Sequence, residues 1–151
     1  MELELMVNER PRRLLVRGEE SLLEALRKLG FASVRSGCET TNCGICTVWV
    51  DEKPVLSCSY PALRCAGRRI TTLEGVRQEA EAFLRCMAEE GADQCGYCSP
   101  GFVMTVLAME RELENPTEAE ISAYLAGNLC RCTGYTSHMR ALRRYLGGER
   151  A

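Results

Sequence analysis

Eight of the ten cysteines in this chain of 151 residues fall into two groups of four, one in each half of the sequence. A thiolate is a metal ligand, and four thiolates complete the coordination of one iron–sulfur cluster or one zinc ion. The pattern therefore predicts two metal centres. The first cysteine set is Cys38, Cys43, Cys46 and Cys58, and the second cysteine set is Cys95, Cys98, Cys130 and Cys132.

The first cysteine set has the spacing of a plant-type [2Fe-2S] loop, because Cys38-x4-Cys43-x2-Cys46 matches that pattern. Gly44 lets backbone amides approach sulfur closely, which stabilises an anionic cluster. Cys58 follows after only eleven residues. A plant ferredoxin leaves a longer gap there, so the match to a simple ferredoxin is incomplete.

The second cysteine set consists of two close pairs, Cys95-x2-Cys98 and Cys130-x-Cys132. Zinc also accepts four cysteines in two close pairs, so the spacing alone leaves zinc open. The iron–sulfur loop in the same chain favours a second cluster over an unrelated zinc ion. A disulfide scaffold is the weakest interpretation at this cysteine content.

Composition narrows the possible partners and the compartment. The net charge is −2, from 19 basic and 21 acidic side chains spread along the chain, which predicts binding to neither nucleic acid nor a membrane. No signal peptide or membrane span is evident, so we expect a soluble cytoplasmic protein, where thiols stay reduced. Cys65 and Cys86, outside both sets, are expected to be small core residues.

The first half of the chain reads as strands with one helix, which predicts a β-grasp sheet. Asn8 and Pro11 supply turn chemistry for the first hairpin. Ser21 and Glu24 form a capping box, and Gly30 ends that helix. The expected elements are strands 3–7 and 13–17, a helix at 21–30, a hairpin of 46–50 with 54–58, and a strand at 68–72.

The second half reads as four helices, which predicts a small four-helix bundle in an α+β protein. Its domains are expected at 1–74 and 75–151. Each close cysteine pair is expected directly before a capped helix, Cys98 before Ser99 and Cys132 before Thr133. The helix expected at 76–91 carries an apolar stripe of Val76, Ala80, Phe83, Leu84 and Met87. The four helices are expected at 76–91, 99–116, 117–127 and 133–148, the third opening with a Thr117–Glu120 capping box.

Three motifs make the chain resemble a known family. They are "GCETTNCGICTVWVDEKPVLSCSYPA", "QCGYCSPGFVM" and "NPTEAEISAYLAGNLCRCTGY". In order and spacing they resemble the small iron–sulfur subunit of the molybdenum hydroxylases, the family of xanthine dehydrogenase, aldehyde oxidoreductase and carbon monoxide dehydrogenase. The resemblance covers nearly the whole chain, and all eight ligand positions carry cysteine.

The resemblance implies a plant-ferredoxin-like N-terminal domain with one [2Fe-2S] cluster and a helical domain with the other. In this family a large subunit carries molybdopterin and oxidises the substrate, and a FAD subunit passes electrons onward. This chain would relay electrons between them. The resemblance also places Cys132 as the ligand nearest the pterin and Gln94 as a possible pterin contact.

One departure bears on the substrate. Many relatives carry a glycine-rich stretch between the first two cysteines, where this chain has Glu39, Thr40, Thr41 and Asn42. These side chains either donate hydrogen bonds to sulfur or face solvent. The polar variant resembles separately encoded subunits of bacterial xanthine dehydrogenases, so a purine is the leading substrate and an aldehyde or similar compound the alternative.

The chain lacks substrate chemistry of its own: it has no G-x-G-x-x-G fingerprint, and no catalytic residue is expected. Its one histidine, His138, is expected at the surface or at an interface and not as a ligand. Arg131 lies between two cysteines and is expected to raise the potential of the second centre, unless it pairs with a carboxylate. Two alternatives stay open, a free-standing two-cluster electron carrier and a zinc-binding interaction module.

Overall fold

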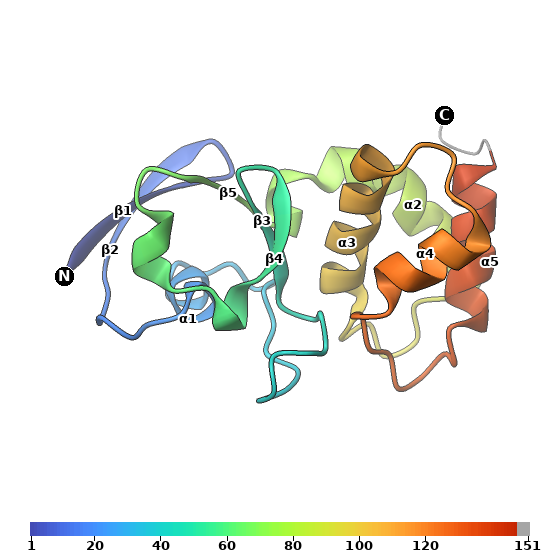
Figure 1. The fold of residues 1–151 in the computed structure, drawn as a ribbon, viewed down its shortest axis with the longest axis horizontal. Coiled ribbons are helices and arrows are strands. Elements are labelled where there is room, and N and C mark those ends of the chain that lie inside the picture. The colour runs from blue at the N-terminus through green and yellow to red at the C-terminus, as the bar shows by residue number, and fades with distance from the viewer. Residues whose placement is uncertain (148–151) are drawn as a thin grey trace.

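The computed structural model describes residues 1–147, and Figure 1 shows a strand-rich half followed by a helical half. Three short 3-10 turns are also present: η1 and η2 lie between the last two strands, and η3 lies between the last strand and the first long helix. The elements in chain order are β1 (Glu2–Val7), β2 (Arg10–Leu15), α1 (Leu22–Lys28), β3 (Thr47–Val50), β4 (Lys53–Leu56), η1 (Ser57–Ser59), η2 (Ala62–Cys65), β5 (Arg69–Thr71), η3 (Leu73–Gly75), α2 (Arg77–Glu89), α3 (Ser99–Glu112), α4 (Glu118–Leu125) and α5 (Thr136–Leu146).

The strands form one mixed sheet in the order β2-β1-β5-β3-β4. The β1–β2 and β3–β4 hairpins are antiparallel, and β5 lies between them, parallel to β1 and antiparallel to β3. Strand β1 alternates exposed and buried residues, so one face of the sheet joins the apolar core that α1 also enters. This arrangement agrees with the predicted α+β class and β-grasp topology.

Both hairpins turn through two residues with positive φ, at Asn8–Glu9 and Asp51–Glu52. A two-residue turn of this kind matches the right-handed twist of the paired strands. The expectation that Pro11 belongs to the first turn was therefore wrong, because Pro11 lies within β2 and pairs with Met6. Strand β2 is at the edge of the sheet, where a residue without an N–H is tolerated.

Local signals located the helices that have capping boxes. Helix α1 has the predicted reciprocal bonds between Ser21 and Glu24, and α4 has them between Thr117 and Glu120. Helix α3 begins with Ser99, but Cys98 is its N-cap, one residue earlier than predicted. Helix α5 begins at Thr136 and not at Thr133, so its start was also predicted wrongly.

The helical half has its own apolar core, which includes Trp49 from β3. The indole nitrogen of Trp49 donates a hydrogen bond to the Met104 carbonyl oxygen at 3.0 Å, so α3 is fixed against the sheet half. The predicted stripe of α2 is buried except for Leu84, which is exposed, so that placement was wrong. Cys65 and Cys86 are buried in the two apolar cores, as predicted.

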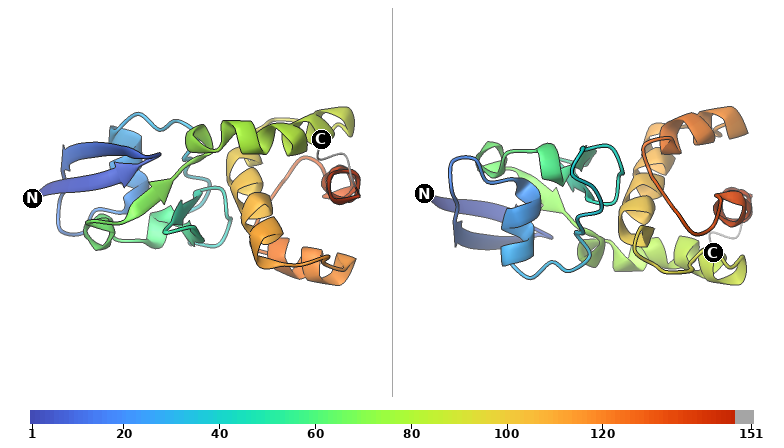
Figure 2. Two further views of the ribbon diagram at one scale, coloured as in Figure 1. Left: turned by 90° about the horizontal axis from the view of Figure 1, so that it is seen from above. Right: turned by 90° about the horizontal axis from the view of Figure 1, so that it is seen from below.

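The four helices α2–α5 do not run side by side. Figure 2 views α5 along its axis, whereas α2, α3 and α4 lie across the view and surround it on three sides. A four-helix bundle keeps its helices within roughly 20° of one another. The predicted bundle is therefore not confirmed, although the helical character of this half is.

Candidate metal centres

The β3–β4 hairpin brings the first cysteine set together. Thr47 pairs with Leu56, so Cys46 and Cys58 lie just beyond the open end of the hairpin. There the Ser57 hydroxyl donates to the Cys46 carbonyl oxygen at 2.7 Å. Cys38 and Cys43 come from the loop that connects α1 to β3. The hairpin explains why eleven residues suffice between the third and fourth cysteines.

The four thiols of the first set interact with one another and with backbone N–H groups. The Cys38 and Cys43 thiols are in hydrogen-bond contact, as are those of Cys46 and Cys58. Backbone N–H groups of Asn42, and then of Thr40, donate to the Cys38 sulfur and lower the pKa of that thiol to about 6. A loop that offers N–H groups to sulfur stabilises thiolate ligands.

The polar residues between Cys38 and Cys43 act through their backbone. The Thr40 hydroxyl and the Asn42 side-chain oxygen lie 3.0 Å apart in an exposed contact with each other. Of the two possibilities left by the sequence, the structure favours side chains that face solvent. The hydrogen bonds to sulfur come from the main chain instead.

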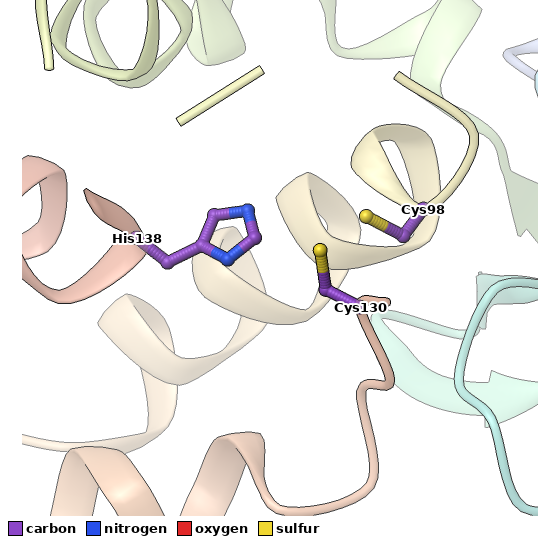
Figure 3. A group of neighbouring side chains, drawn as sticks. All are labelled: Cys98, Cys130 and His138. Atoms are coloured by element: carbon purple, nitrogen blue, oxygen red, sulfur yellow. The ribbon is translucent and has the colours of Figure 1, made fainter. Parts of the chain in front are cut away.

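The second cysteine set is built from two loops, the first between α2 and α3 and the second between α4 and α5. The thiols of Cys98 and Cys130 are in contact, and so are those of Cys95 and Cys132. Figure 3 shows the sulfurs of Cys98, at the start of α3, and Cys130 facing the same space. The structure therefore gathers all four predicted cysteines, although they come from separate segments.

The two close cysteine pairs differ in how near they lie to the helix that follows them. Cys98 caps α3, but Cys132 lies four residues before α5, so the expectation that Cys132 stands directly before a capped helix was wrong. Burial raises the pKa of the Cys98 thiol to about 12. Burial acts in the same direction on Cys130, but hydrogen bonds from the side chain and backbone of Thr133 outweigh it, and the pKa of Cys130 is lowered.

His138 is buried, so the prediction that it lies at the surface was wrong. Its side chain is 2% exposed, and its ring lies 4.4 Å from that of Phe102, centroid to centroid. A ring nitrogen of His138 and the sulfurs of Cys98 and Cys130 lie within 4.8 Å of one another. Burial lowers the pKa of the imidazole. The signal was available, because His138 shares the apolar face of its helix with Ala141, Leu142 and Tyr145.

The two cysteine sets lie next to each other. The Leu129 N–H donates a hydrogen bond to the Cys43 carbonyl oxygen at 2.8 Å, which joins the neighbour of Cys130 to a member of the first set. The Arg35 guanidinium donates to the Gly96 carbonyl oxygen at 2.6 Å, which ties the α1–β3 loop to the α2–α3 loop as well. In Figure 1 the α1–β3 and α4–α5 loops lie on the same side of the molecule.

Six of the eight cysteines border a shared depression of about 480 Å³. Apolar side chains stand exposed at its edge, with Tyr97 at 47% and Leu129 at 48% of full exposure. Arg131 also borders the depression; it is exposed and forms no ion pair with any residue in the range 1–147. Gln94 is exposed beside Cys95. This face therefore presents sulfur ligands, apolar surface and one unpaired cation together.

Comparison with known proteins agrees with this arrangement. The chain matches the model of a 2Fe-2S iron–sulfur cluster binding domain over residues 5–89 and that of a [2Fe-2S] binding domain over residues 72–143. It is 39% identical over 142 residues to the nicotinate dehydrogenase small FeS subunit of Eubacterium barkeri, covering 92% of this chain and 90% of that one. It is 42% identical over 137 residues to the xanthine dehydrogenase iron–sulfur-binding subunit of Escherichia coli O157:H7, covering 88% and 86%.

The chain belongs to the [2Fe-2S] iron–sulfur subunits of the molybdenum hydroxylases. Its structure superimposes on quinoline 2-oxidoreductase from Pseudomonas putida 86 with a TM-score of 0.89 and 32% identity, over 99% of this chain and 96% of that chain. The family resemblance predicted from the three motifs is therefore confirmed. The chain is therefore an oxidoreductase subunit that binds iron–sulfur and transfers electrons. Among residues 1–147, no helix has the length and apolar character needed to span a membrane.

Proposed function

We propose that the first cysteine set ligates one [2Fe-2S] cluster and the second set another, in domains spanning 1–74 and 75–151. The donor chemistry supports this assignment, because each set gathers four thiols and its sulfurs accept backbone N–H groups. A bound [2Fe-2S] cluster accepts and releases one electron at a time. The eight cysteines hold the two clusters in place, and the surrounding N–H groups stabilise their negative charge.

The observation that carries the proposal is the short link between the sets. From Cys130 the path runs through Leu129, across its 2.8 Å hydrogen bond, to the Cys43 carbonyl. The chain thereby relays electrons from a molybdopterin site in a large subunit, past the second set and then the first, toward a flavin subunit. Cys132 and Gln94 are exposed on the second-set side, and we assign them the positions facing the pterin.

The substrate of the assembled enzyme is a nitrogen heterocycle, with a purine favoured and an aldehyde as the alternative. The named relatives act on nicotinate, xanthine and quinoline, which share a ring nitrogen. The enzyme works in the cytoplasm, where its thiols stay reduced during cluster assembly. Purification of the native complex, followed by assays with xanthine, nicotinate and an aldehyde, tests this assignment. Absence of a molybdenum subunit from the purified complex would favour a free-standing carrier.

Leu129 provides a test of the docking face, by which we mean the exposed surface around the shared depression that we propose contacts the large subunit. Leu129→Glu should weaken assembly with the large subunit at least tenfold, because a charge replaces exposed apolar surface beside the second cysteine set. The backbone link to Cys43 does not depend on the side chain. Leu15→Glu is the matched control, because Leu15 is exposed on the far edge strand. Pull-down with the tagged large subunit measures both, and equal retention of the two variants would contradict this docking face.

Arg131 provides a test of the local field. Reduction adds negative charge to the second centre, so an adjacent cation favours the reduced state. Arg131→Ala should lower the midpoint potential of that centre by about 20–50 mV, since solvent and salt screen an exposed charge. Arg131→Lys keeps the charge and should stay near the unmodified value. Redox titration monitored by electron paramagnetic resonance measures the midpoint potential of each variant. An unshifted midpoint in the alanine variant would refute the electrostatic role.

A further inference from the structure

The Thr133 hydroxyl lies at the centre of a small polar group beside the second cysteine set. Its oxygen is 3.2 Å from the Cys130 sulfur and 3.1 Å from His138 Nδ1, and it accepts a hydrogen bond from the Tyr135 N–H at 3.1 Å. None of these contacts was expected from the sequence. His138 thus reaches the sulfur of Cys130 through one intervening hydroxyl.

Counting hydrogens decides which group donates to which. A hydroxyl has one hydrogen to donate and two lone pairs to accept with, whereas a thiolate only accepts. The Tyr135 N–H occupies one lone pair of Thr133 Oγ1. If His138 Nδ1 accepted the only hydroxyl hydrogen, no hydrogen would be left between the Thr133 hydroxyl and the Cys130 thiolate. A hydrogen bond from this hydroxyl to the thiolate therefore requires His138 to donate through Nδ1–H, whereas the backbone N–H of Thr133 donates to the sulfur in either case.

We propose that His138 is a positioning residue for the second metal centre: its Nδ1–H donates to Thr133 Oγ1 and directs the hydroxyl hydrogen onto the Cys130 sulfur. The inference rests on the proposed cluster at the second cysteine set. Its consequence is a higher potential for that cluster, because a hydrogen bond to a sulfur ligand is stronger when the cluster carries the extra electron.

Burial supports a neutral imidazole with this tautomer. His138 is almost fully buried against Phe102, in an environment that disfavours the charged form. Its other nitrogen, Nε2, is buried and has no hydrogen-bond partner among the described residues. With the hydrogen on Nδ1, the unpaired Nε2 is an acceptor. The other tautomer would leave a buried N–H donor without a partner, and proteins tolerate an unpaired donor less often than an unpaired acceptor. The tautomer that serves Thr133 is also the one that suits the buried ring.

Paired variants of the cluster-loaded, assembled enzyme test the proposal. Thr133→Val removes the hydroxyl and keeps the shape, and His138→Phe keeps an aromatic ring and removes the donor. At a fixed potential, Thr133→Val should lower the reduced-to-oxidised ratio of the second cluster about tenfold, which is 59 mV for one electron. His138→Phe should lower the ratio in the same direction by less, because the hydroxyl stays and loses only the donor that orients and polarises it. The double variant should shift no further than Thr133→Val, because both changes act through the same hydroxyl.

Two conservative variants and an internal reference separate this role from a structural one. Thr133→Ser keeps the hydroxyl, and His138→Asn places an amide N–H near the Nδ1 position, so both should stay close to the unmodified midpoint. The first cluster should keep its potential in every variant. If His138→Phe left the second midpoint unchanged, or if the two single shifts added in the double variant, the proposal would be overturned.

Electron–nuclear double resonance of the reduced enzyme gives a direct readout of the hydrogen bond. Backbone N–H groups of Thr133 and Cys132 also donate to Cys130, so the unmodified enzyme is compared with Thr133→Val. The unmodified enzyme should show one more exchangeable proton coupled to the second cluster than Thr133→Val, and equal signals in the two proteins would overturn the hydrogen bond from the Thr133 hydroxyl. Absence of the second cluster itself from the unmodified enzyme would instead defeat the proposed function, so the two failures are distinguishable.

Discussion

Cys46→Ser should abolish the first metal centre and leave the second intact. Cys46 is buried at the base of the β3–β4 hairpin and contacts Cys58, so the substitution removes one of the four thiols from inside the first set. The loaded variant should lose about half of its iron and one of its two resonance signals on reduction. Cys98→Ser should give the complementary result, with the first centre retained.

Cys65→Ala is the control for these substitutions. Cys65 is fully buried in the sheet core, outside both cysteine sets, and burial raises the pKa of its thiol to about 11. This variant should keep all of its iron and both signals. If Cys46→Ser or Cys98→Ser removed both signals from a protein that is still folded, the division into two independent sets would be wrong.

Gly101→Ala should destabilise the contact between α3 and the loop of the first cysteine set. A Cβ at position 101 would lie 2.4 Å from the Gly44 carbonyl oxygen and 2.5 Å from that of Ile45. Backbone atoms cannot move aside as a side chain can, so the free energy of unfolding should fall by about 1–3 kcal/mol. Because Cys43 and Cys46 flank these carbonyls, iron loading should fall as well.

Gly127→Ala is the matched control, because a Cβ there meets no atom within 4 Å and its φ is not in the left-handed region. Denaturant unfolding of the loaded proteins should show little change for Gly127→Ala and a clear loss for Gly101→Ala. Equal stability and equal iron content in the two variants would show that α3 does not press on the loop as closely as the structure indicates.

Local chemistry predicted the parts of the fold that depend on nearby residues. The capping boxes at Ser21 and Thr117 located α1 and α4, because each box satisfies backbone N–H groups within one turn. The spacing of Cys38, Cys43 and Cys46 predicted the [2Fe-2S] chemistry, because one loop supplies three of the four thiols. These features need no knowledge of distant segments.

Features that depend on distant segments were not predictable in the same way. Thr133 was predicted as a helix cap, but its hydroxyl contacts Cys130 and His138, and the chain reaches α5 only after Tyr135 adopts a left-handed backbone. Leu84 has helical spacing like its buried neighbours, yet it is 38% exposed. In each case tertiary packing decided between two locally acceptable conformations.

The orientation of the helices also depends on distant segments. Apolar periodicity predicts which face of a helix is buried, but it does not predict the angle at which two helices cross. Helix α5 therefore crosses the other three, where a bundle was expected. The cysteines of the second set still meet, because the loops before α3 and α5 converge beside the first set.

The most direct test of the account is analysis of metal and sulfide in the chain purified without air, combined with paramagnetic resonance after reduction. Two [2Fe-2S] clusters predict a red-brown protein with about four irons and about four acid-labile sulfides per chain, and two distinct signals. A colourless protein that keeps zinc and takes up no labile sulfide after anaerobic reconstitution would contradict the account and favour a zinc-binding interaction module.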